Sequence, residues 1–215
     1  MAKYTGADCR LCRREGCKLY LKGEKCSSTK CPILTKYAPP GDHGKGRKKA
    51  SGYSIQLREK QKTKRYYGVT EKQFKMYYDR ASEMRGVTGD NMLTLIERRL
   101  DNAVYRLGLG SSRAMARQIV NHGHITVNGK TVDIPSYLIK VGDVIAVKEN
   151  KKDSSMWDAV KETKNLSLVK WLEFDNATLT GKVVALPQRE DIDLDIQEHL
   201  IVELYSKESD WRTQL

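Results

Sequence analysis

The stretch SSRAMARQIVNHGHITVNGKTV (residues 111–132) switches its hydrophobic period partway along. In its first half, apolar side chains recur every three or four residues, which predicts a helix over 113–122 with one face buried. The two serines before it, Ser111 and Ser112, are candidate N-caps, and Gly123 suits the residue that ends the helix.

The second half alternates apolar and polar residues around Asn128-Gly129, a pair that favours the two-residue turn of a β-hairpin. Another turn at 141–143 precedes the apolar segment VIAVK (144–148), which predicts a further strand. The order helix, hairpin, strand indicates an α+β protein whose sheet is antiparallel.

Three further helices are predicted upstream. Two of them are SIQLREKQKTKRYYG (54–68) and the segment 70–86, each closed by a glycine. The third covers 93–107 and ends at Gly108, because one apolar stripe runs along it. That stripe consists of Leu93, Ile96, Leu100, Val104 and Leu107.

The positive charge is concentrated in the first ninety residues. Residues 1–90 hold 22 Lys and Arg against 9 Asp and Glu, whereas residues 91–215 hold 17 against 18. Such an excess repels itself unless a polyanion balances it, and nucleic acid is the common polyanion of the cytoplasm. A solvated basic tail is the alternative, but the tyrosines of this segment argue against it. Because no apolar run suits a membrane span or a secretory signal, we expect a cytoplasmic protein.

The candidate phosphate contacts are the cations of residues 10–65 and a row on the helix 113–122. Arg113, Arg117 and Asn121 recur every four residues, so we expect all three to point away from the core, where the guanidinium groups can hold phosphate oxygens. The two histidines and the hairpin turn follow at the same edge. The full set of predicted RNA contacts is Arg10, Arg13, Arg14, Lys45, Arg47, Lys48, Lys49, Arg58, Lys60, Lys62, Lys64, Arg65, Arg113, Arg117, His122, His124, Asn128 and Lys130.

All five cysteines lie within residues 9–31. Four of them are spaced Cys9-x2-Cys12 and Cys26-x4-Cys31, which predicts a structural Zn²⁺ site of four thiolates. Such a site would fold a small basic knob that has too few apolar residues for a core of its own. Two alternatives stay open: disulfide pairing, which a reducing cytoplasm disfavours, and replacement of Cys12 or Cys26 by Cys17.

The glycines of PPGDHGKGRKK (39–49) lack the Gly-Lys-Ser/Thr ending of a nucleotide-binding loop. We interpret this segment as a flexible linker or an arm whose backbone can approach RNA phosphates. His122 and His124 have no cysteine or acidic neighbour in the sequence that would complete a metal site. No nucleophile motif appears either, and we predict that the chain is not an enzyme.

The run RLDNAVYRLGLGSSRAMARQIVNHGHITVNGKTVDIPSYLIKVGDVI (99–145) resembles the RNA-binding module that is named after bacterial ribosomal protein S-four. Other segments resemble the S-four family of small-subunit ribosomal proteins in the same order, from residue 1 to about residue 207. These segments are CRLCRREGCKLYLKG, PPGDHGKGRKK, LREKQKTKRYYG with EKQF soon after it, and LIVELYSK.

This resemblance implies a constituent of the small ribosomal subunit that binds the five-prime domain of 16S rRNA early, nucleates assembly and influences decoding accuracy. The implied protein neighbours are S-three and S-five, and some family members also bind their own messenger RNA. Zinc-binding members use four cysteines that match Cys9, Cys12, Cys26 and Cys31. We expect no membrane partner and no homo-oligomer in the ribosome.

Four segments are therefore expected. They are a zinc-binding knob and basic arm over 1–45, a helical rRNA-binding domain over 46–95, the S-four RNA-binding module with its antiparallel sheet over 96–200, and a C-terminal segment over 201–215 that packs back on the helical domain. Two other classes share some of these features. An RNA-modifying enzyme would need a catalytic domain, for which the residues after Trp157 are too few, and a zinc-dependent DNA-binding regulator would need a recognition helix with zinc-finger spacing.

Overall fold

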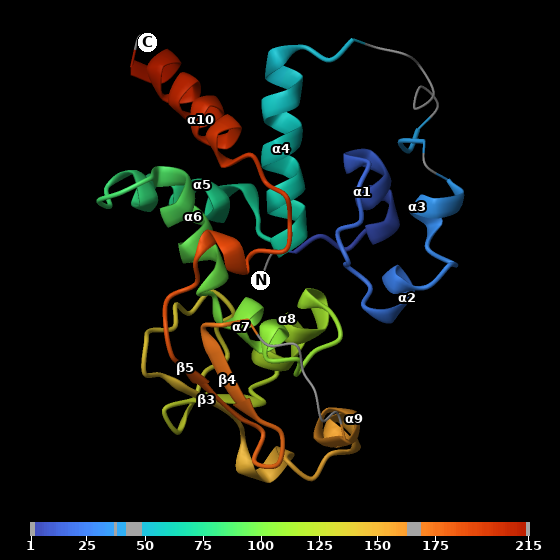
Figure 1. Ribbon diagram of the computed structural model, residues 1–215, viewed down its shortest axis with the longest axis vertical. Coiled ribbons are helices and arrows are strands. Elements are labelled where there is room, and N and C mark those ends of the chain that lie inside the picture. Colours follow the sequence, from blue (N-terminus) through green and yellow to red (C-terminus); the bar gives the residue numbers. More distant parts are fainter. Residues whose placement is uncertain (1–2, 37, 42–48, 163–168, 214–215) are drawn as a thin grey trace. The chain divides into compact units, whose positions relative to one another are not determined.

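The computed structural model describes residues 3–36, 38–41, 49–162 and 169–213, with residues 208–213 described by their backbone. Two compact units are present: Met1–Met92 together with Leu194–Leu215, and Leu93–Asp193. The first is helical and the second contains the sheet (Figure 1), so the expected α+β class is confirmed. The expected boundaries differ from these units, because the chain re-enters the first unit at Leu194 rather than after residue 200. No helix in the described ranges is long and apolar enough to cross a membrane.

The first unit is built around the long helix α4. Ser51 caps α4 by accepting a hydrogen bond from the backbone N–H of Ser54 at 3.2 Å, and Gly68 ends it with a φ of +64°. Both helices predicted here are confirmed, although α5 ends at Ser82 and not at residue 86. The helices of this unit are α1 (Asp8–Glu15), α2 (Glu24–Ser27), α3 (Pro32–Thr35), α4 (Gly52–Tyr67), α5 (Glu71–Ser82), α10 (Glu198–Thr213) and the start of α6 (Thr88–Glu97).

Glu71, the first residue of α5, joins three helices of this unit. Its carboxylate accepts hydrogen bonds from Lys60 Nζ at 2.6 Å, Lys64 Nζ at 2.8 Å and the Tyr205 hydroxyl at 2.9 Å. The Lys60 ammonium also lies 5.1 Å from the centre of the Tyr205 ring. Helix α10 packs along α4 through these contacts, so the carboxyl end of the chain completes the helical unit.

In the second unit, two helices pack against one sheet: α7 (Leu100–Arg106) and α8 (Arg113–Asn121). Its strands are β1 (Ile125–Val127), β2 (Lys130–Thr131), β3 (Val144–Val147), β4 (Leu172–Asp175) and β5 (Thr180–Val183). Short helical turns, η1 (Glu149–Lys151), η2 (Ser155–Trp157), α9 (Asp158–Glu162) and η3 (Arg189–Asp191), lie between and after the strands.

All strand pairs are antiparallel, in the order β2-β1-β3-β5-β4. Asn128 and Gly129 both have positive φ, +50° and +78°, which confirms the predicted two-residue hairpin turn between β1 and β2. Gly181 on β5 allows close packing, because a Cβ there would stand 2.7 Å from a methyl group of Leu107. The hairpin of β4 and β5 was not predicted, although the alternating segments on either side of residues 176–179 carry its signal.

The helix predicted over 93–107 is wrong as a single element, because it breaks into α6 and α7 at residues 98–99. The backbone there bonds across to the segment 135–139: Leu100 N donates to Tyr137 O at 2.8 Å, and Ile139 N donates to Arg98 O at 3.0 Å. These hydrogen bonds replace those that a continuous helix would form. The apolar stripe therefore runs on through two separate helices.

The sequence Arg99-Leu100-Asp101-Asn102 is buried entirely and forms a polar network at the start of α7. Arg99 donates to Asp101 through Nε at 3.0 Å and Nη2 at 2.7 Å, and the backbone N–H of Asn102 donates to the same carboxylate at 2.9 Å. A bidentate ion pair of this kind offsets the free-energy cost of burying the guanidinium group away from water.

Replacing Asp101 by Asn should destabilise the protein by about 3 kcal/mol, because the buried guanidinium of Arg99 loses its counter-charge. Denaturant unfolding followed by circular dichroism measures the change. The control is Asp133→Asn, an exposed carboxylate in the same unit, which should shift stability by less than about 0.5 kcal/mol. Equal effects of the two substitutions would contradict a structural role for the pair.

The contacts of Glu71 with Lys60, Lys64 and Tyr205 predict that the stability of the protein is sensitive to acid. Burial alone would raise the pKa of Glu71, but the hydrogen bonds and charges of Lys60 and Lys64 outweigh it and lower the pKa to about 2. A lowered folded-state pKa stabilises the protein above the ordinary value of 4.5, and this contribution is lost as the pH falls toward 2.

We therefore expect Glu71→Gln to cost roughly 1 kcal/mol at pH 7, a value reduced for the solvent exposure of this side chain. The difference in melting temperature between wild type and variant should shrink as the pH is lowered from 4.5 to 2. Glu83→Gln, an exposed residue just after α5, is the matched control and should show no such trend. A difference in melting temperature that stays constant across this pH range would rule out a stabilising role of the ionised Glu71 carboxylate.

Candidate nucleic-acid interface

The cysteines form a loose group around α1 and α2. Cys12, Cys26 and Cys31 are buried, and the backbone N–H of Lys22 donates to Cys26 Sγ at 3.3 Å. Burial raises the pKa of the Cys12 thiol, a backbone hydrogen bond from Leu19 lowers it, and the neighbouring Cys26, Cys9 and Cys31 raise it further. Cys12 therefore lies within electrostatic reach of the three other predicted zinc ligands.

Cys17 has different surroundings. Burial raises the pKa of its thiol, and the charges that act on it belong to Lys62, Glu15 and Glu59, not to the other cysteines. The division into four ligands and one separate thiol stays a prediction. Within the described part of the chain, however, no three His, Cys, Asp or Glu side chains are placed as a metal site, so zinc binding remains a prediction.

The cations of α4, which the sequence predicted as RNA contacts, are paired with carboxylates. Arg58 and Arg65 both donate through Nη1 to one oxygen of Glu15, Arg58 at 3.3 Å, and Lys62 donates to Glu59 at 2.9 Å. Lys60 and Lys64 bind Glu71. The sequence did not show these pairs because Glu15 and Glu71 come from the neighbouring helices α1 and α5.

The cations of α1 are more available. Arg10 and Arg14 are exposed, and neither forms a contact ion pair among the residues that the structure describes. Arg13 is partly buried and donates through Nε to the carbonyl of Ala38 at 2.9 Å. Lys49 is exposed just before α4, whereas the predicted contacts Lys45, Arg47 and Lys48 lie outside the described residues. Arg10, Arg14 and Lys49 are thus exposed cations of the first unit.

The predicted outward row on α8 is wrong in its orientation. Arg113 and Arg117 are only 7% and 6% exposed. Arg113 donates through Nε to Asn102 Oδ1 at 2.9 Å and stacks over the Tyr105 ring, while Arg117 reaches Asp101 at 3.4 Å. The polar groups of α7 draw both guanidinium groups inward. Asn121, the third member of the predicted row, is exposed, together with Ala114 and Gln118.

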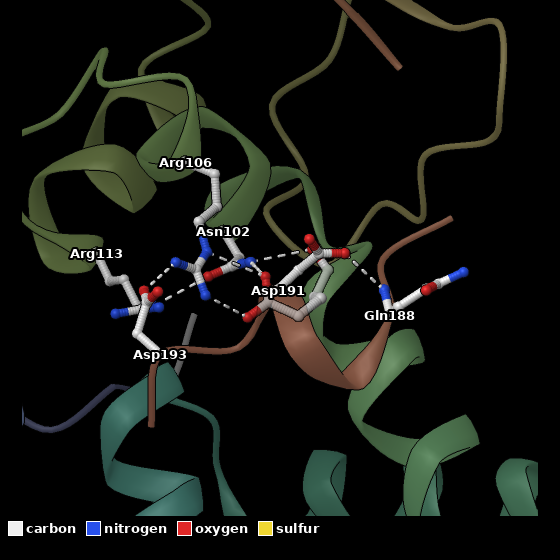
Figure 2. A network of polar contacts seen from close by, with 7 residues as sticks. Asn102, Arg106, Arg113, Gln188, Asp191 and Asp193 are labelled. Atoms are coloured by element: carbon white, nitrogen blue, oxygen red, sulfur yellow. Dashed lines mark hydrogen bonds and ion pairs between the residues drawn. The ribbon is translucent and has the colours of Figure 1, made fainter. Parts of the chain in front are cut away.

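Figure 2 shows how this network continues from α7. Arg106 donates to Glu97 at 2.9 Å and also pairs with Asp193, while Asn102 bonds to both Glu97 and Arg113. Nearby, Asp191 accepts a hydrogen bond from the backbone N–H of Gln188 at 2.9 Å. Asp193 is therefore a structural partner of Arg106, and Asp191 caps the turn η3.

The remaining predicted contacts lie after α8. The rings of His122 and His124 are 6.1 Å apart, with His122 more exposed. Burial lowers the pKa of His124, and the charges of Lys151 and His122 lower it further, so its imidazole is neutral at pH 7. Lys130 is exposed on β2, but the side-chain amide of Asn128 is occupied with Asp143 at 2.8 Å and the backbone N–H of Val144 at 2.9 Å.

Sequence reasoning missed the acids that organise these cations. Glu15 follows Arg13 and Arg14 in a basic segment, and its side chain is 1% exposed. Asp101 and Asn102 interrupt an apolar run, and both are buried. Neither residue belongs to the apolar stripe of the predicted helix, so the helical pattern contained no signal for their burial.

Comparison with known proteins covers nearly the whole chain. Residues 3–97 match the family described as Ribosomal protein S4/S9 N-terminal domain, and residues 98–145 match the S4 domain. Small ribosomal subunit protein uS4 of Ruminiclostridium cellulolyticum is 62% identical over 208 residues, that of Acetivibrio thermocellus 61% over 208, and that of Clostridioides difficile 58% over 207. Each alignment covers 96% of this chain and 100% of the relative. The chain belongs to the uS4 family of small ribosomal subunit proteins.

Proposed function

We propose that this chain is a structural constituent of the small ribosomal subunit and binds its ribosomal RNA. It acts by binding and not by catalysis, and its place is the ribosome in the cytoplasm. The observation that carries the mechanism is the exposure of the cations Arg10, Arg14 and Lys49, whose charges are not neutralised by contact with carboxylates in the described part of the chain. Such cations gain most when they displace counterions from phosphates.

The finer assignment follows the family resemblance. The chain binds the five-prime domain of 16S rRNA, nucleates assembly of the subunit and influences translational accuracy. Its protein neighbours are of the S-three and S-five type, and its own messenger RNA is a further ligand. Binding of the isolated five-prime-domain RNA, with no other protein present, tests the first of these statements. Equal affinity for a central-domain RNA of the same length would contradict it.

Phosphate contacts by α1 predict a change in salt dependence. For the double variant Arg10→Ala, Arg14→Ala, the plot of log K against log salt should be shallower by about 0.9 for each phosphate that the variant no longer neutralises. The control is Lys140→Ala, Lys182→Ala, two exposed cations in the second unit, which should leave the slope unchanged. Filter binding or fluorescence anisotropy between about 50 and 200 mM salt, the range over which such contacts are usually resolved, gives both slopes. Identical slopes in all three proteins would exclude α1 from the interface.

We propose that Cys9, Cys12, Cys26 and Cys31 bind a structural Zn²⁺ ion. The donor set supports this proposal, because three of the four thiols are buried and Cys12 lies within electrostatic reach of the other three. When bound, zinc would cross-link the knob and so replace the stabilisation that its small apolar core cannot supply. Cys17 faces charges near α4 and is not a ligand in this proposal.

Metal analysis of purified variants tests the ligand set. Cys9→Ser should lose the zinc and also lower the melting temperature, because the knob loses its cross-link. Cys17→Ser should retain one zinc per chain. Zinc loss in Cys17→Ser but not in Cys9→Ser would show that the ligand set is wrong.

A further inference from the structure

A cavity of about 270 Å³ lies in the first unit at the carboxyl end of α4. Tyr4, Leu11 and Val69 contribute its apolar wall, and Gln61, Lys64 and Arg65 contribute its polar side. This volume is below the range of roughly 300–1,000 Å³ for pockets that bind drug-sized molecules, which suits a single planar ring system.

The Tyr4 ring is in a position to stack. Its side chain is 54% exposed, although it lines the cavity. The hydroxyl end of the ring lies close to Gly6, because a Cβ there would overlap the Tyr4 hydroxyl oxygen and stand 2.6 Å from Cζ. Proteins bind unpaired bases through aromatic faces that are open to solvent in this way.

A cluster of arginines adjoins the cavity through Arg65. Arg65 and Arg58 share one oxygen of Glu15, and Arg14 also acts on this carboxylate electrostatically. Two guanidinium groups that share one carboxylate leave an excess of one positive charge, to which the nearby Arg14 adds its own. Glu15 is 1% exposed, whereas the Arg58 and Arg65 side chains are 32% and 23% exposed, so an incoming anion meets the arginines and not the carboxylate.

We propose that this cavity binds one unpaired nucleotide of RNA, whose base stacks on Tyr4 and whose phosphate is held by Arg65 and Arg58. The proposal rests on the proposed RNA-binding function and adds to it a specific single-stranded contact. Charge selects an anionic ligand, and the flat exposed ring beside the charge selects a base. An apolar side chain of a neighbouring protein could fill the cavity, but it would leave the charges of the arginines without a partner.

Substitutions of Tyr4 in the full-length chain test the stacking. Tyr4→Ala should weaken binding of small-subunit rRNA at least about fivefold, the lower end of the measured effect of one base stack. Tyr4→Phe should bind as well as wild type, because it keeps the ring. Tyr53→Ala is the matched control, since Tyr53 is also exposed in this unit but does not line the cavity.

The salt slope separates this site from the general phosphate contacts. Tyr4→Ala should lower the affinity without changing the slope, because it removes no charge. Photo-crosslinking of RNA that contains 5-bromouridine should attach a base at Tyr4, as mapped by mass spectrometry. Unchanged affinity of Tyr4→Ala, or equal weakening in Tyr4→Phe, would overturn the stacking while RNA binding stands. Absence of rRNA binding by the wild-type chain would overturn the proposed function as well.

Discussion

The second unit depends on the ion pair between Arg99 and Asp101. A guanidinium with no exposed surface is stable only beside a carboxylate, so the pair fixes the chain at the point where α6 ends and α7 begins. That break lets the backbone bond to the segment 135–139 and lets α7 lie against the sheet, where Leu107 packs on Gly181. Asp101 also receives Arg117, so one carboxylate serves α7 and α8 together.

The first unit follows the same rule with Glu15 and Glu71. Each of these carboxylates holds two cations of α4, and each comes from a different neighbouring helix. Few acids are therefore sufficient to stabilise the packed surface of a very basic segment. The cations that gain no such partner at contact distance, Arg10 and Arg14 among the described residues, remain on the surface. Internal pairing thus separates the α4 cations, which share carboxylates, from Arg10 and Arg14 of α1, which form no contact ion pair in the described part of the chain.

The sequence was most informative where a local rule determines the structure. The α8 helix, its Ser112 cap, the Asn128-Gly129 turn and the ends of α4 all depend on residues within a few positions of each other. It was least informative about orientation. Spacing alone placed Arg113 and Arg117 in one row, but the direction of that row depends on Asp101 and Asn102, which lie on another helix. The pairing of the α4 cations escaped prediction for the same reason.

The return of the chain at Leu194 has a consequence for synthesis of the protein. The second unit is one continuous segment, whereas the first needs α10, whose Tyr205 binds Glu71. As the polypeptide emerges from the ribosome, the sheet-bearing unit can therefore fold before α10 is available to pack against the amino-terminal helices. A nascent chain that stalls before residue 194 would present α4 with an uncovered side, a target for chaperones and proteases.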